Sequence, residues 1–129
     1  GNKQPESLEA KILFDADKLD VIGAYGIART IGYALQEGSP FFAEPSSSFL
    51  QEGEGEPGEI HSAYHEYLYK LSNVADSLNT QPARVIAKTR RRVLDAFFNQ
   101  LAIEARLEDL EDRQRIPDDS QEINDVGSK

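Results

Sequence analysis

The chain has 129 residues, enough for one domain but too few for two domains of ordinary size. It contains no cysteine, which excludes disulfides, thiolate metal sites and cysteine nucleophiles. Its apolar runs are too short to span a bilayer, and its net charge of −9 argues against nonspecific binding to nucleic acids or to anionic membranes.

Residues 8–35 are predicted to form two helices. Leu8 and Ile12 belong to an apolar stripe with three- and four-residue steps, and this stripe resumes with Ile27 after Gly23. Glycine is unfavourable inside a helix, so we expect a bend near Gly23. The alternative is that the glycines here let another backbone approach closely.

Residues 36–59 are predicted to form a long, acidic, flexible loop. This stretch holds six acidic residues and no basic residue, and its serines, glycines and prolines follow no helical or strand period. Phe41 and Phe49 are expected to hold its first half against the body, with the acidic second half solvated. Residues 60–78 return to an apolar pattern that predicts another helix.

A long amphipathic helix is predicted from Thr80 to about residue 112. Thr80 suits an N-cap, and Pro82 in the first turn has no N–H that would need a partner. Residues 113–129 are expected to be a disordered acidic tail. Residues 1–7 are expected to be a leader or cleavage remnant, since the chain opens on glycine and contains no methionine. The predicted class is all-α, a helical bundle over residues 8–112.

Three aspartates in the first helix are candidates for a metal site. Asp17 and Asp20 are three residues apart and share a helix face, whereas Asp15 points away from both. Carboxylate oxygens suit Mg²⁺ or Mn²⁺. The alternative is a solvated helix face whose charge is balanced by Lys11 and Lys18.

Two further clusters have both a chemical and a structural interpretation. His61 and His65 have the spacing of two zinc ligands, but structural histidines explain them equally well. Arg84, Lys88 and Arg91 belong to a basic run on the last helix. They could bind phosphate, or they could be solvated or paired with nearby acids.

The segment ILFDADKLDVIGAYGIART, residues 12–30, resembles the HD-domain metal-dependent phosphohydrolases. Residues 69–71, 78–84 and 97–104, with Ala87 and Arg90, resemble the same family, so the resemblance covers about residues 8–108. It implies an HD-type helical fold and a cytoplasmic hydrolase that cleaves phosphate ester or anhydride bonds, with nucleotides as the expected substrates.

The resemblance also implies roles for individual residues. In that family a His, an adjacent His-Asp pair and a later Asp bind a divalent metal, and Asp17 matches the later Asp, with Asp15 as the alternative. The ion, Mn²⁺ or Mg²⁺, would lower the pKa of a bound water and polarise a phosphoryl oxygen. Lys18 and Arg29 become candidates for contacting substrate phosphate. Asp20 could orient the site without binding the metal itself.

The sequence departs from that family in one respect. It contains no His-Asp dipeptide, and both histidines follow Asp17. The resemblance therefore implies the C-terminal half of an HD domain, inactive alone, whose partner is the N-terminal half or another chain. Self-association is expected from the apolar surface left open. The alternatives are a degenerate HD-fold module for binding or regulation and, last, a helical scaffold that oligomerises through residues 82–112.

Overall fold

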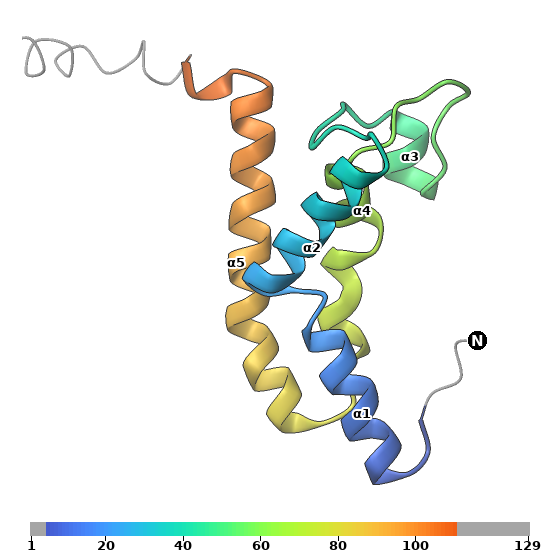
Figure 1. Cartoon of the computed structure of the whole chain (residues 1–129), viewed down its shortest axis with the longest axis vertical. Helices are drawn as coiled ribbons and strands as arrows, with labels where there is room; N and C mark the ends of the chain where they lie inside the picture. The colour runs from blue at the N-terminus through green and yellow to red at the C-terminus, as the bar shows by residue number, and fades with distance from the viewer. Residues whose placement is uncertain (1–4, 111–129) are drawn as a thin grey trace, which may run out of the picture.

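The computed structural model describes residues 5–110, and every regular element in this range is helical. The elements in chain order are α1 (Leu8–Leu19), α2 (Gly23–Gln36), α3 (Ser47–Glu52), α4 (Ala63–Tyr69), the 3₁₀ helix η1 (Leu71–Ser77) and α5 (Gln81–Ala105). The long α5 stands along one side of the molecule, and α1, α2, α4 and η1 all contact it (Figure 1). The predicted all-α bundle is confirmed. None of the described helices combines the length and the apolar character that crossing a membrane requires.

The core is built around the middle of α5. Leu94 and Phe98 are completely buried there. The Phe98 ring stacks on Tyr67 of α4, with centroids 4.6 Å apart and planes 12° apart. The Tyr67 hydroxyl donates to Asp95 Oδ1 at 2.8 Å. Burial and this bond raise the pKa of Tyr67, so the phenol stays a protonated donor that joins α4 to α5.

The break between α1 and α2 explains why two glycines stand beside it. Gly23 has a φ of +74°, and a Cβ atom there would lie 3.0 Å from Cβ and Cγ of Arg90. A Cβ atom on Gly26 would overlap the backbone carbonyl of Val21. The predicted bend is confirmed, and the close backbone approach that was its alternative is present as well.

A pair of glycine substitutions on α2 is expected to have opposite effects. Gly26→Ala should lower the free energy of unfolding by about 1–3 kcal/mol, because the new methyl group overlaps Val21. Gly32→Ala should raise it by up to ~1 kcal/mol, since no atom lies within 4 Å of the added Cβ and alanine favours the helix. Urea denaturation followed by circular dichroism measures both. Equal stability of the two variants would contradict the packing at Gly26.

The prediction of an aperiodic loop over residues 36–59 is wrong for its middle part, which forms α3. Ser46 caps this helix by accepting the Phe49 N–H at 3.1 Å, and the Phe49 side chain is buried. A local cap and one buried aromatic side chain thus outweigh the polar composition.

Two predicted helix boundaries are also wrong. The helix expected over residues 60–78 begins only at Ala63, and it changes after Tyr69 into the separate 3₁₀ helix η1. The helix expected to reach residue 112 ends at Ala105, and Leu107 follows in the left-handed region with a φ of 60°. The predicted tail over residues 113–129 lies outside the described residues, as do the first four residues of the predicted leader.

Candidate functional site

Asp15 is buried, and its carboxylate accepts four hydrogen bonds from the chain just before α5. Oδ1 accepts from the backbone N–H and the side-chain amide of Asn79, at 2.8 and 3.2 Å. Oδ2 accepts from the backbone N–H and the hydroxyl of Thr80, both at 2.7 Å. A carboxylate has about four lone-pair positions that can accept hydrogen bonds, and these four donors occupy them. Asp15 therefore ties α1 to the start of α5.

This contact also explains how α5 begins. Thr80 is the N-cap residue, as predicted, but its side chain makes no capping bond because its hydroxyl donates to Asp15. Burial raises the pKa of Asp15, but the hydrogen bonds from Asn79 and Thr80 outweigh it and hold the pKa below its usual value. The ionised carboxylate also lies at the positive end of the α5 dipole.

Asp17 lies on the opposite side of α1 from Asp15 and is exposed. Asp20, directly after the helix, is exposed as well, and Lys18 has its Nζ 5.4 Å from the centre of the Phe14 ring. Arg29 is exposed on α2. Across residues 5–110, no side-chain hydrogen bond or ion pair joins these four predicted site residues to one another, although the Asp20 backbone N–H donates to the Lys18 carbonyl at the end of α1. They lie on neighbouring helices without forming a cluster.

Exposed apolar side chains accompany the candidate residues on both helices. Leu13 stands one turn before Asp17 and is 72% exposed, and Tyr25 stands one turn before Arg29 and is 69% exposed. Residues four apart share a helix face. Each of the faces that carry Asp17 and Arg29 therefore also presents a large apolar side chain that is exposed.

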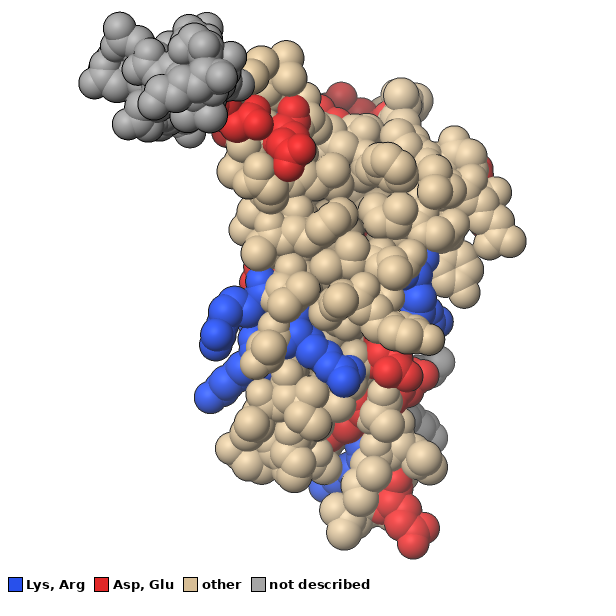
Figure 2. All heavy atoms as spheres, turned by 60° about the vertical axis from the view of Figure 1, so that its left-hand side comes forward, with Lys and Arg blue, Asp and Glu red and all other residues tan. Residues whose placement is uncertain are grey.

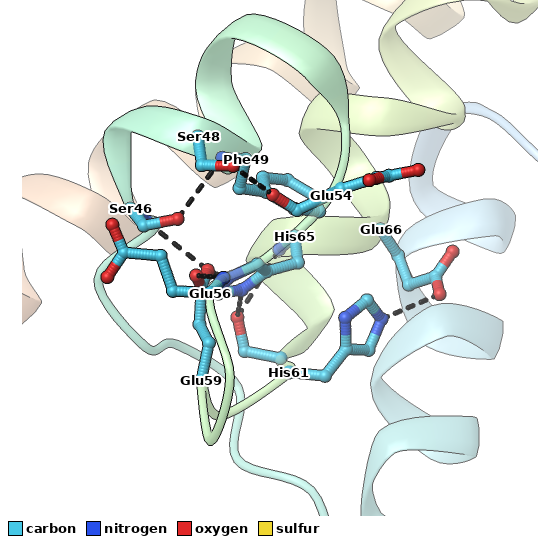
Figure 3. A network of polar contacts seen from close by, with 10 residues as sticks. Ser46, Ser48, Phe49, Glu54, Glu56, Glu59, His61, His65 and Glu66 are labelled. Carbon is cyan, nitrogen blue, oxygen red and sulfur yellow. Dashed lines mark hydrogen bonds and ion pairs between the residues drawn. The ribbon is translucent and has the colours of Figure 1, made fainter.

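The two histidines have different partners (Figure 3). His65 is buried, with its Nε2 2.8 Å from Glu59 Oε2 and its Nδ1 2.7 Å from Ser62 Oγ. Since a carboxylate only accepts, Nε2 carries the proton and Nδ1 accepts from the serine hydroxyl. His61 donates from Nε2 to Glu66 Oε1 at 2.8 Å. The structural interpretation holds for His65, because both of its ring nitrogens are engaged inside the fold.

Glu59 fastens the acidic loop to the body. Besides His65, its carboxylate accepts the backbone N–H of Ser46 at 3.2 Å and that of Glu56 at 2.8 Å, and its side chain is only 11% exposed. The prediction of a solvated second half is wrong at this residue. Hydrogen bonding from Ser46, then from His65 and Glu56, lowers the pKa of Glu59 to about 2.

Glu59→Gln is expected to flatten the loss of stability in acid. A carboxyl whose pKa is lower in the folded chain stabilises it above the unfolded pKa near 4.5, and this contribution is lost as the pH falls toward 2. The variant, which cannot ionise here, should be less stable than the parent at pH 6, with the gap narrowing steadily below pH 4.5. Thermal melts across pH 2–7 measure this. A constant gap would contradict the role of the Glu59 charge.

Most of the basic side chains described on α5 bond to other parts of the fold. Arg84 donates to the carbonyls of Leu78 and Asn79, and Arg90 donates to the Leu19 carbonyl at 2.9 Å. Arg91 lies 3.5 Å from Asp76 and 3.7 Å from Asp95. The acid-paired interpretation thus holds for Arg91. Lysine and arginine side chains gather at mid-height of the molecule in Figure 2, and Lys88 and Arg92 are exposed.

The described residues by themselves do not make a complete metal site. Between residues 5 and 110, no three His, Asp or Glu side chains come together as a ligand set. Asp17 can offer one carboxylate, and further ligands would have to come from outside this part of the chain. Asp15 does not fit the ligand role, because its oxygens already accept four bonds.

Comparison with known proteins gives one curated relative and several solved structures. The uncharacterized protein YpgQ of Bacillus subtilis is 37% identical over 99 residues, which are 77% of this chain and 41% of YpgQ. No family model matches the chain. The chain thus spans less than half the length of this curated relative.

The solved structures share the fold. A Lactobacillus plantarum protein is 28% identical with a TM-score of 0.64, over 82% of this chain and 53% of that one. An HD-superfamily hydrolase from Bacillus thuringiensis is 29% identical with a TM-score of 0.61, over 78% and 47%. YpgQ in complex with ADP is 32% identical with a TM-score of 0.59, over 78% and 45%. The chain has an HD-like helical fold over about half the length of these structures.

Proposed function

We propose that this chain is part of a metal-dependent phosphohydrolase of the HD type. The observation that carries the proposal is the likeness to an HD-superfamily hydrolase at 29% identity, combined with the exposed position of Asp17. Asp17 is the proposed metal ligand. The alternative, Asp15, is set aside because its carboxylate is fully engaged with Asn79 and Thr80.

The proposed substrates are nucleotides or related compounds with phosphate ester or anhydride bonds. The support is that YpgQ was crystallised in complex with ADP. Arg29 and Lys18 are the proposed phosphate contacts: Lys18 directly follows Asp17 in the sequence, and Arg29 lies on the next helix, α2. Arginine can bind phosphate through two nitrogens. A nucleotide substrate also agrees with the predicted cytoplasmic location.

We further propose that the chain forms the C-terminal half of the domain and that its partner is the half that completes it. The relatives are about twice as long as the matched region, and the faces around Leu13 and Tyr25 are apolar and exposed. Covering these faces would bury apolar surface and bring other metal ligands toward Asp17. Without that half, we expect the chain to self-associate through these faces.

The test compares the chain alone with the chain co-expressed with the part of YpgQ that lies outside the matched region. We expect Mn²⁺-dependent release of phosphate from ADP only in the co-expressed sample, and Mn²⁺ binding near one equivalent by calorimetry. Light scattering should show self-association only for the chain alone. A monomeric chain that gains neither partner nor activity would contradict the proposal.

A degenerate HD-fold module for binding or regulation is the second candidate. It is favoured by one observation: in the described part of the chain the histidines pair with glutamates, and no three metal-ligating side chains meet. Formation of a stable complex with the YpgQ segment, without Mn²⁺ binding, would support this candidate over the hydrolase.

A further inference from the structure

A hollow lies between α2 and the start of α4, next to the part of α2 that follows Arg29. Its volume is about 350 Å³, and the buried Ala34 and Ala63 form its apolar base. Ligand pockets range from about 300 to 1,000 Å³, so this one suits a molecule of one or two rings. In Figure 3, His61 and Glu66 stand on the side of α4 that faces α2.

The charged side chains that line the hollow are acidic. Glu37 from α2 and Glu66 from α4 both line it, and among residues 5–110 no lysine or arginine does. Lys70 lies 3.6 Å from Glu66 but is not part of the lining. In the neutral tautomer whose Nε2 donates to Glu66, the other ring nitrogen of His61 is an acceptor. The hollow therefore favours a neutral or cationic ligand with N–H donors and disfavours an anion.

Two planar side chains border the hollow from opposite elements. Tyr33 on α2 is 61% exposed although it lines the hollow, and the His61 ring comes from the segment before α4. Flat aromatic faces bind flat rings by stacking. The hydroxyls of Thr30 and Ser39 add hydrogen-bonding positions at the edge.

We propose that this hollow binds an amino-substituted heteroaromatic ring of the nucleobase type. The ring stacks on Tyr33, and its amino group donates to Glu66 or Glu37. Such a ring could be a free nucleoside or the base of a nucleotide, and only the second case rests on the proposed hydrolase function. In that case the phosphates lie outside the acidic hollow, toward Arg29, the residue before Thr30.

Adenosine is the probe, with inosine as the analogue that lacks the amino group and benzoate as the anionic ring. Titrations followed by NMR on the full chain should show adenosine shifting the signals of Tyr33 and His61, with weaker binding of inosine and none of benzoate. Tyr33→Ala should weaken adenosine binding about fivefold or more. Tyr25→Ala removes another largely exposed tyrosine of α2, one that does not line the hollow, and should leave adenosine binding unchanged.

Glu66→Gln provides a second variant, and it should reduce the preference for adenosine over inosine. ADP without metal then identifies the source of the ring. Tighter binding than adenosine, lost in Arg29→Ala, indicates the base of a nucleotide, whereas equal or weaker binding indicates a free nucleoside. No adenosine binding at millimolar concentration, or equal binding of benzoate, would overturn the proposal. These titrations need neither metal nor hydrolysis. A failure of the proposed hydrolase function can therefore be distinguished from a failure of the proposed ring-binding site.

Discussion

Asp15→Ala is expected to lower the free energy of unfolding by about 2–4 kcal/mol, the largest effect of any single acidic residue in the described fold. The substitution removes an acceptor from four donors at once, two on Asn79 and two on Thr80. It also removes the negative charge at the positive end of α5. The loss therefore combines unpaired donors with a weakened helix terminus.

Urea denaturation followed by circular dichroism measures this effect, and the same helix supplies the controls. Asp17→Ala and Asp20→Ala remove exposed carboxylates and should change the free energy of unfolding by less than about 0.5 kcal/mol. Asp15→Asn should lie between, because its amide keeps one acceptor oxygen but turns the other position into a donor. If Asp15→Ala were as stable as Asp17→Ala, the Asp15 contacts would be contradicted.

The pH dependence of Asp15 gives an independent check. Its pKa is held below the usual value of 3.8, so the carboxylate stabilises the folded chain above that pH and loses this contribution as the pH falls further. The parent should therefore lose more stability than Asp15→Asn on acidification below pH 4. This pH range overlaps the range in which Glu59 loses its stabilising contribution. Only a variant that replaces both Asp15 and Glu59 removes both pH-dependent contributions to stability.

Local patterns predicted the parts of the fold that depend on neighbouring residues. The two helices over residues 8–35 follow from three- and four-residue spacings and the start of α5 from the capping preference of Thr80, and both are confirmed, although Leu8 and Ile12 of the apolar stripe are exposed. The end of the last helix was not predicted, because Leu107 adopts a left-handed conformation that its side chain does not signal. Similarly, Phe49 gave no sign that a six-residue helix would form around it.

The site depended on contacts between distant residues, and these were beyond the reach of spacing rules. The helical period correctly places Asp15 and Asp17 on opposite faces, but it cannot say which face is buried. That choice depends on Thr80, which lies 65 residues from Asp15. The role of Glu59 depends on Ser46 in the same way, 13 residues away. The hollow between α2 and α4 has no motif at all, since its lining comes from two separate stretches of chain.

Asp17→Ala is expected to have the opposite profile to Asp15→Ala, with activity lost and stability kept. In the chain completed by the YpgQ segment, the substitution should reduce Mn²⁺-dependent phosphate release from ADP by at least about 100-fold. Loss of a group that only supports a metal ligand costs about 10–100-fold, and loss of a ligand should cost more. Calorimetry should show weaker Mn²⁺ binding in parallel, which separates a ligand from a residue that only contacts substrate.

Asp20→Ala is the matched control, because it removes another exposed carboxylate three residues along the same chain. We expect it to keep Mn²⁺ binding, with at most a moderate loss of rate if Asp20 orients the site. Equal Mn²⁺ affinity and rate in Asp17→Ala and the parent would contradict the assignment of Asp17. The two aspartates of the Asp-Ala-Asp segment face opposite ways: Asp15 holds α5 in place from inside the fold, and Asp17 is exposed, where the proposed metal and the proposed second half of the domain would reach it.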